Sequence, residues 1–299
     1  MKKALIFPGQ ASQYVGMTSD FYQSSEKAKQ ILDQANSVLG FDILNIMFNG
    51  PEESLKQTEI TQPAIFIHSY LVSQFLKTEF HATSGHSLGE YSALCVAGVF
   101  DFETGLKLVR LRGQLMQKAG QEQPGTMAAV IGATNEAIEA ACSEASSVGI
   151  VQAANFNSPG QVVISGSVDG VKKAMELVKA KGAKLVKELV VSGAFHSPLM
   201  ASAAEKLGEA LKATNLLNPK VPVYMNVTGK PSSNPQEIKD LLLKQLTSPV
   251  RWEESIRNMS SDGITGFVEV GPGKVLQGLV KRIADSAEIS GFDKYMEVQ

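Results

Sequence analysis

The pentapeptide Gly85-His86-Ser87-Leu88-Gly89 lies between a short β-prone run, residues 80–84, and a helix-like segment, residues 90–99. A serine on a sharp turn between a strand and a helix is typical of a nucleophile elbow. The flanking glycines let strand and helix approach closely, and the N–H after the serine points to where an oxyanion forms. The G-x-S-x-G pattern alone arises about 0.2 times by chance in such a chain, so Ser87 is a candidate nucleophile that needs partners.

The composition is that of an ordinary globular protein. With 299 residues, 43% of them hydrophobic and 19% charged, the chain can bury the core of one large domain or of a domain that carries an insertion. The formal net charge of −2 gives no general attraction to nucleic acid or to an anionic membrane, so neither is an expected partner. The two cysteines form no CxxC pair and no Cys/His cluster, which argues against a disulfide framework and a metal site.

The first residues predict a cytoplasmic protein. Met1-Lys2-Lys3 resembles the start of a signal peptide, but the apolar run that follows covers only residues 4–7 and is ended by Pro8-Gly9. That run is too short for the hydrophobic region of a signal peptide. No other run approaches the length of a transmembrane helix, so we expect no contact with a membrane.

Strand-like and helix-like patterns alternate around the elbow. Buried-type strands are expected at residues 4–7, 80–84, 221–227 and 266–270. Helices are expected at residues 18–39, 62–79, 90–99, 101–119, 235–246, 252–260 and 274–284, with one more from after Pro198 to about residue 213. This alternation predicts an α/β domain with a mostly parallel sheet. The turn at residues 8–13 follows a strand, which is where open α/β sheets place their sites.

Residues 126–191 show a different order. Strands are expected at residues 127–131, 149–153, 161–165 and 185–191, and helices at residues 135–146 and 168–181. The order β-α-β-β-α-β is that of the ferredoxin-like motif. Turn-rich segments bound this unit on both sides. We therefore predict a small ferredoxin-like domain, residues 124–193, inserted in a large domain formed by residues 1–123 and 194–299.

Arg112 is a candidate anion-binding residue. Helical spacing places it beside Leu108, Val109, Leu115 and Met116, on the apolar face of the helix expected at residues 101–119. A guanidinium on an inward face normally needs an anionic partner, because an unpaired buried charge costs several kcal/mol. The alternative is an arginine that extends from a half-buried helix to solvent.

A nucleophilic serine needs a base, and histidine titrates near neutral pH. Of the four histidines, His68 lies within a helix, His81 precedes the elbow, and the side chain of His86 diverges from its neighbour Ser87. His196 lies on a loop downstream of the serine, in the order usual for α/β-hydrolase sites. His196 is the candidate base, against the alternative of a structural histidine. No acid between Ser87 and His196 is an evident third member, so a backbone carbonyl or an amide is expected to orient the imidazole.

The order of motifs resembles the malonyl-CoA:acyl carrier protein transacylases. The matching segments are Phe7-Pro8-Gly9-Gln10, Gln62-Pro63-Ala64, Gly85 to Leu94, Arg110-x-Arg112-Gly113, Asn155-x-Asn157-Ser158-Pro159, Phe195-His196-Ser197, Gln245-Leu246-x-x-Pro249-Val250 and Glu269-x-Gly271-Pro272-Gly273. They span almost the whole chain, and eight motifs in order are far more specific than the elbow alone. The resemblance implies a hydrolase-like large domain with the ferredoxin-like domain inserted.

The resemblance also implies roles for individual residues. Ser87 would attack a malonyl thioester, with His196 as base and Gln245 orienting His196 through its main-chain carbonyl. The backbone N–H groups of Gln10 and Leu88 would form the oxyanion hole.

Four further residues would contact the substrate in the family. Arg112 would pair bidentately with the malonyl carboxylate, and Phe195, Asn155 and Gln62 would line the site, although Asn155 has an equally ordinary interpretation as part of a turn. Ala11 stands where the family usually has glycine, which would strain the Gln10 loop if that position needs a positive φ.

The implied reaction is transfer of malonyl from malonyl-CoA to the phosphopantetheine thiol of an acyl carrier protein, for fatty acid synthesis. The alternatives are a freestanding acyltransferase of a polyketide synthase, a serine esterase or thioesterase, and an inactive module that only binds a carrier protein. No bound cofactor and no metal are expected, and a monomer is the family default. Lysines of the small domain are candidates for carrier docking: Lys172, Lys173, Lys179, Lys181 and Lys184.

Overall fold

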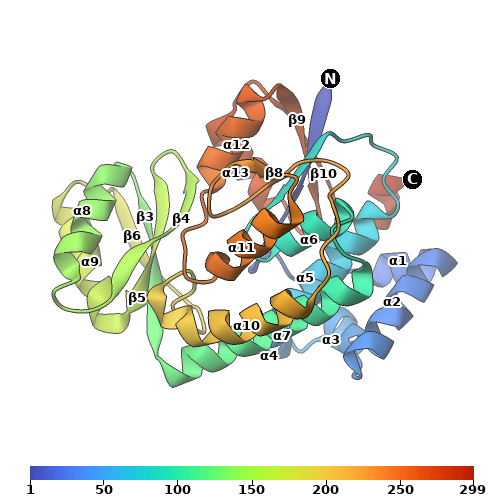
Figure 1. Ribbon diagram of the computed structural model, residues 1–299, viewed down its shortest axis with the longest axis horizontal. Helices are drawn as coiled ribbons and strands as arrows, with labels where there is room; N and C mark the ends of the chain where they lie inside the picture. Colours follow the sequence, from blue (N-terminus) through green and yellow to red (C-terminus); the bar gives the residue numbers. More distant parts are fainter.

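The structure contains two separate sheets, and the larger one brings the candidate site together. A computed structural model describes residues 1–299 (Figure 1). The strands of sheet A are β1 (Lys2–Phe7), β2 (Ala82–Gly85), β7 (Val223–Tyr224), β8 (Pro231–Ser232), β9 (Ile264–Val270) and β10 (Glu288–Phe292). Their order is β10-β9-β1-β2-β7-β8, and only the β7–β8 pair is antiparallel. Phe7 pairs with Gly85, so the loops after β1 and β2 leave the same edge of the sheet side by side.

Side chains of β1 alternate between two hydrophobic cores. Leu5 and Phe7 belong to the larger core, and Ala4 and Ile6 belong to a second core on the other face. Successive residues of a strand point to opposite faces, so a strand covered on both sides must be apolar throughout. This explains why the sequence at residues 4–7 is a continuous apolar run.

Helices cover both faces of sheet A. The helices outside the second sheet are α1 (Ser19–Ser24), α2 (Glu26–Leu39), α3 (Ile43–Asn49), α4 (Glu52–Leu55), α5 (Thr58–Ser73), α6 (Gly89–Val96), α7 (Phe102–Glu122), α10 (Ala201–Ala213), α11 (Pro235–Gln245), α12 (Trp252–Ser261) and α13 (Val275–Ile283). Two short 3₁₀ turns lie at Pro198–Met200 and Tyr295–Val298. Helices α5 and α7 contribute to the larger core, whereas α12 and α13 contribute to the second. None of the helices is both long and apolar enough to cross a membrane.

Sheet B forms a smaller lobe with helices on one side, at the left of Figure 1. Its elements are β3 (Gly125–Ile131), α8 (Asn135–Ala145), β4 (Val151–Ser158), β5 (Gln161–Ser167), α9 (Val168–Ala180) and β6 (Leu185–Leu189). The strand order is β4-β5-β3-β6, and every pair is antiparallel. A separate core of 14 buried residues lies within this lobe, so its helices pack on its own sheet. The expected α/β class with a mostly parallel sheet is confirmed, together with a separate antiparallel sheet.

Several expected element boundaries are wrong. The helix expected at residues 18–39 is two helices, because Ser25 adopts an extended conformation and its side chain caps α2. The helix expected at residues 62–79 spans Thr58–Ser73, so Pro63 is its sixth residue and lies in its second turn rather than at its first positions. The strand expected at residues 221–227 is reduced to Val223–Tyr224. Helices α3 and α4 and strands β8 and β10 have no counterpart among the expected elements.

Candidate active site

The elbow has the geometry that its sequence predicts. Ser87 lies between β2 and α6 with a φ of 52°, a left-handed conformation that residues with a side chain rarely adopt. A Cβ atom on Gly85 would lie 1.9 Å from the carbonyl carbon of Gly89, and one on Gly89 would lie 2.1 Å from the carbonyl oxygen of Phe7. Both positions therefore require glycine, since strand, turn and helix are in direct backbone contact there.

Asn226 holds the turn from the other side. Its Oδ1 accepts the backbone N–H of Ser87 at 2.8 Å, and its Nδ2 donates to the carbonyl of Gly85 at 2.7 Å. The two bonds satisfy the backbone N–H of the strained residue and a backbone carbonyl two residues before it. No sequence signal singled out Asn226, because it follows a two-residue strand far along the chain.

Ser87 and His196 are in contact. The Oγ of Ser87 lies 2.8 Å from Nε2 of His196, and Nδ1 of His196 lies 2.9 Å from the carbonyl oxygen of Gln245. A carbonyl can only accept, so Nδ1 carries the hydrogen and Nε2 is left to accept from the serine hydroxyl. His196 is buried, and burial together with the nearby Arg112 lowers the pKa of its imidazole to about 3. The imidazole is therefore uncharged at neutral pH.

The other three histidines are engaged elsewhere. Nε2 of His86 lies 2.8 Å from Oδ1 of Asn157, Nε2 of His68 lies 3.0 Å from the carboxylate of Asp293, and Nδ1 of His81 accepts the backbone N–H of Lys3. None of these three rings is hydrogen-bonded to Ser87, so His196 alone has the position of a base.

Arg112 is completely buried beside the serine. Its NH1 donates to Oε1 of Gln62 at 2.8 Å, and its NH2 donates to Oγ of Ser87 at 3.1 Å and to Oε1 of Gln245 at 3.0 Å. All of these acceptors are uncharged, and Nε has no acceptor at all. Burial lowers the pKa of the guanidinium, which reflects the cost of placing a charge away from water. The group is thus a buried cation with donors available for an incoming anion.

Glu90 lies behind these residues, and the sequence alone did not mark it as a site residue. Its Oε1 accepts the backbone N–H of Asn226 and its Oε2 accepts from Nε2 of Gln245, each at 2.6 Å. Gln245 also donates to the carbonyl of Ser87 at 2.9 Å. Burial raises the pKa of Glu90 to about 7. The available signal was its position, since Glu90 is the one charged residue of the otherwise uncharged helix α6.

The loop after β1 lies against the elbow. A Cβ atom on Gly9 would be 2.5 Å from the carbonyl oxygen of His86, and the backbone N–H of His86 donates to the carbonyl of Phe7. The N–H groups of Gln10 and Leu88 donate to no acceptor within the protein. Ala11 has a φ of 81°, so the position where the family usually has glycine does adopt a left-handed conformation. An alanine there costs about 1 kcal/mol relative to an unstrained residue.

The other predicted site residues lie around Ser87, His196 and Arg112. Gln62 is buried and binds Arg112, and Phe195 packs its ring into the larger core directly before His196. Asn155 lies on β4, where it lines a hollow of about 220 Å³ together with Gln10 and His86. The hollow lies between sheet B, the Gln10 loop and α13. No group of three or more His, Cys, Asp or Glu side chains is arranged to hold a metal ion.

Comparison with known proteins identifies the family. A model described as the acyl transferase domain matches residues 4–293. The malonyl CoA-acyl carrier protein transacylase of Haemophilus influenzae is 46% identical over 289 residues, which cover 95% of this chain and 93% of that protein. The transacylase of the same name from Bacillus subtilis is 44% identical over 286 residues, covering 94% of this chain and 90% of that protein.

Solved structures give the same result. An acyl carrier protein S-malonyltransferase from Vibrio cholerae superimposes with a TM-score of 0.95 at 44% identity, covering 99% of this chain and 98% of that one. A malonyl-transacylase in complex with a type II polyketide synthase acyl-carrier protein superimposes with a TM-score of 0.96 at 40% identity, covering 100% and 98%. The resemblance stated from the motifs is confirmed, and this chain belongs to the malonyl CoA-acyl carrier protein transacylases of the acyl transferase domain family.

Proposed function

We propose that this enzyme transfers a malonyl group from malonyl-CoA to the phosphopantetheine thiol of an acyl carrier protein, through a malonyl ester on Ser87. The observation that carries the proposal is that Oγ of Ser87 lies within hydrogen-bond distance of both Nε2 of His196 and NH2 of Arg112. A nucleophile shared by a neutral base and a buried cation suits an acyl group that carries its own negative charge.

In the first half-reaction, Oγ of Ser87 attacks the thioester carbon while Nε2 of His196 takes the hydroxyl proton. The free N–H groups of Gln10 and Leu88 would stabilise the resulting oxyanion. Collapse of the tetrahedral intermediate breaks the C–S bond, and the sulfur of CoA leaves with the proton from His196. The product is a malonyl ester on Ser87.

In the second half-reaction, His196 takes the proton of the phosphopantetheine thiol and the sulfur attacks the ester. The C–O bond to Ser87 then breaks, and the serine oxygen regains the proton from His196. Arg112 would hold the malonyl carboxylate throughout, with two parallel hydrogen bonds. Phe195 and Asn155 would line the site, Gln62 would fix Arg112, and Gln245 would orient His196.

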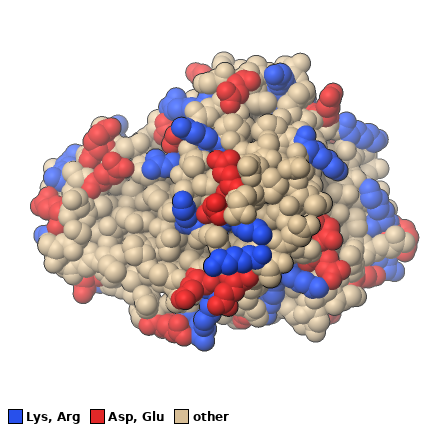
Figure 2. Space-filling model, viewed as in Figure 1, with Lys and Arg blue, Asp and Glu red and all other residues tan.

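The finer features of the fold belong to the same proposal. The order and pairing of β3, β4, β5 and β6 support a ferredoxin-like domain, residues 124–193, inserted in a hydrolase-like domain of residues 1–123 and 194–299. We take the protein to be a cytoplasmic monomer without a bound cofactor. Figure 2 shows acidic and basic side chains interspersed over the visible face.

The carrier protein's docking surface stays a prediction. Of the five candidate lysines, Lys173 lies 3.5 Å from Glu176 and Lys181 lies 3.4 Å from Glu144. Both ion pairs are exposed and therefore contribute little to stability, so these lysines remain free to exchange partners.

A mass measurement of the intact protein tests the transfer. After incubation with malonyl-CoA we expect a malonyl adduct that persists in water and is lost when holo acyl carrier protein is added. Rapid release of free malonate without an acceptor would instead identify an esterase or thioesterase. Absence of any adduct would identify an inactive carrier-binding module. Comparing the rates of discharge onto an acyl carrier protein of fatty acid synthesis and onto one of polyketide synthesis would distinguish the two roles.

The pH dependence of acylation tests the state of the base. Because the pKa of His196 is lowered to about 3, the acylation rate should not fall with a midpoint near 6.5 as it would for an ordinary histidine. Any midpoint near pH 7 should belong to Glu90, whose pKa is raised to about 7 by burial, and should vanish in Glu90→Gln. Rapid-quench acylation between about pH 5 and about pH 9 measures this.

Glu269 provides the matched control. Burial also raises its pKa to about 7, but its carboxylate accepts the backbone N–H groups of Leu276 and Gln277 at the start of α13. Glu269→Gln should leave the pH profile unchanged. A midpoint near 6.5 that survives Glu90→Gln would contradict the assignment of a neutral, low-pKa base.

A further inference from the structure

The small sheet is hydrogen-bonded to the loop that follows α11. The backbone N–H of Val250 donates to the carbonyl of Ala154 at 2.8 Å, and the N–H of Phe156 donates to the carbonyl of Val250 at 2.9 Å. Val250 thereby extends the β4 edge of sheet B by one parallel bridge. The loop directly follows Gln245, the last residue of α11, whose carbonyl accepts from the imidazole of His196. Sheet B is thus fixed to the segment that orients the base.

One side chain of β4 makes a second connection. Nε2 of Gln152 donates to the carbonyl of His196 at 2.8 Å and to the carbonyl of Thr247 at 3.2 Å. An amide nitrogen has two hydrogens, so one can serve each carbonyl. The two acceptors belong to the loop that carries the base and to the loop that orients it. Gln152 therefore joins these two loops from outside the large lobe.

The backbone of His196 needs such support. Its φ is 56°, a left-handed conformation that residues with a side chain rarely adopt. The carbonyl group and the imidazole are both attached to the Cα atom of His196, so a change in the backbone conformation there moves both groups. Gln152 holds the carbonyl of His196, and the carbonyl of Gln245 holds its Nδ1. With both groups held, the ring has little freedom to turn away from Ser87.

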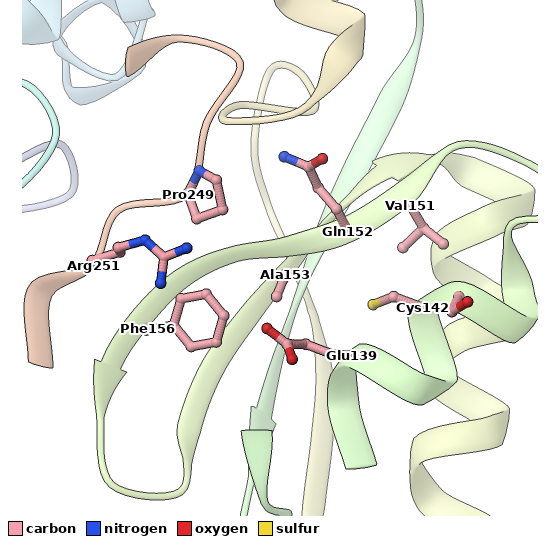
Figure 3. Close-up of a pocket in the computed structure, with 9 residues that line it drawn as sticks. Glu139, Cys142, Val151, Gln152, Ala153, Phe156, Pro249 and Arg251 are labelled. Carbon is pink, nitrogen blue, oxygen red and sulfur yellow. The ribbon is translucent and has the colours of Figure 1, made fainter. Parts of the chain in front are cut away.

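The surroundings of Gln152 leave room for substitution. Figure 3 shows the amide of Gln152 on one side of β4, with Phe156 and Glu139 on the other. An open hollow of about 280 Å³ borders this segment, between α8, β4 and the loop at Pro249 and Arg251. Gln152 is only partly buried there. A side chain of different shape can therefore be placed without overpacking a core.

We propose that Gln152 is a positioning residue for His196, through which the small sheet fixes the catalytic base. The inference rests on the proposed function, in which His196 serves both half-reactions. Gln152 touches neither Ser87 nor Arg112, so it acts on the reaction only through the two loops. The same imidazole moves the proton in acylation and in discharge, and a displaced ring slows both steps equally.

Gln152→Leu removes both hydrogen bonds at nearly constant volume. We expect acylation by malonyl-CoA and discharge onto holo acyl carrier protein each to slow by about tenfold, with the KM for malonyl-CoA unchanged within about twofold. Gln152→Asn keeps the amide but is one methylene too short to reach both carbonyls, so its rates should lie between those of Gln152→Leu and the wild type. It also provides the measurement if Gln152→Leu does not fold.

Thr126→Val is the matched control within the same sheet. The hydroxyl of Thr126 donates to Glu188 at 3.0 Å, a bond internal to the small lobe. Its removal perturbs sheet B without touching either loop, and both rates should stay within about twofold of the wild type. Thermal unfolding of all variants separates loss of stability from loss of positioning.

Nuclear magnetic resonance of protein with ¹⁵N-labelled histidine gives a readout that does not depend on activity. In the wild type, His196 should show the pattern of an imidazole protonated only at Nδ1. In Gln152→Leu, the two ring nitrogen shifts should move toward each other as the tautomers begin to exchange. In Thr126→Val they should stay in place.

The outcomes distinguish this inference from the proposed function. A wild-type protein that forms no malonyl adduct would overturn the transfer reaction, while the ring nitrogen shifts would still test the positioning of His196. A wild type that transfers malonyl, with Gln152→Leu equally fast in both half-reactions and unchanged in its ring shifts, would overturn the role of Gln152. Equal losses in Thr126→Val would overturn it as well, because they would indicate a general effect of the sheet.

Discussion

Ser87→Ala is expected to form no malonyl adduct and to lower the rate of malonyl transfer by at least about 10⁴-fold. The variant lacks the oxygen that lies 2.8 Å from Nε2 of His196 and 3.1 Å from NH2 of Arg112, and with it the nucleophile of the proposed mechanism. The fold should persist, because Asn226 binds the backbone N–H of residue 87 and the flanking glycines are unchanged. Intact-mass analysis after malonyl-CoA treatment measures the adduct, and a coupled assay measures the transfer.

Ser92→Ala is the control for this experiment. Ser92 is buried on α6 just beyond the elbow, and its hydroxyl has no hydrogen-bond partner. Removing it should leave adduct formation and transfer unchanged. An adduct of normal yield in Ser87→Ala would show that another residue carries the malonyl group, and the mechanism proposed above would fail.

Arg112→Ala is expected to lower kcat/KM for malonyl-CoA by about 10³-fold, since a buried carboxylate that loses its charged partner costs about 3–5 kcal/mol. Acetyl-CoA has no carboxylate, so its kcat/KM should not fall, and the ratio of malonyl to acetyl transfer should collapse. Arg112→Lys keeps the charge without the two-pronged geometry and should recover only part of the loss. Steady-state rates with both acyl-CoA substrates measure the ratio.

Arg110 offers a matched control on the same helix. Its guanidinium binds the carbonyl and the carboxylate of Glu59, away from the serine. Arg110→Ala should therefore keep the preference for malonyl. If the malonyl-to-acetyl ratio of Arg112→Ala equals that of Arg110→Ala, Arg112 does not recognise the carboxylate.

The parts of the site that lie on regular elements could be predicted from the sequence. Arg112 follows the 3.6-residue period of an amphipathic helix, and that period placed it on the apolar face, with an arginine reaching to solvent as the alternative. The elbow could be predicted because its glycines mark a sharp turn between a strand and a helix. His196 could be proposed because only one histidine lies on a loop after the serine.

Residues whose role depends on distant contacts could not be predicted in the same way. Asn226 and Glu90 meet 136 positions apart in the chain, through a bond that no local pattern encodes. Gln152 is part of an ordinary strand pattern, and its use appears only when two loops of the other lobe are placed beside it. The break between α1 and α2 was missed for a related reason, since the apolar spacing continues across Ser25 while the backbone does not.

The left-handed backbones of Ser87 and His196 have an evolutionary consequence. Each conformation costs about 1–2 kcal/mol for a residue with a side chain, and glycine would relieve it. Glycine at either position would also remove the hydroxyl or the imidazole. On the mechanism proposed above, selection for activity retains the hydroxyl and the imidazole despite this strain. In a descendant released from catalysis, glycine at position 87 would relieve the strain, whereas glycine at position 196 would also leave a cavity and an unpaired carbonyl at Gln245.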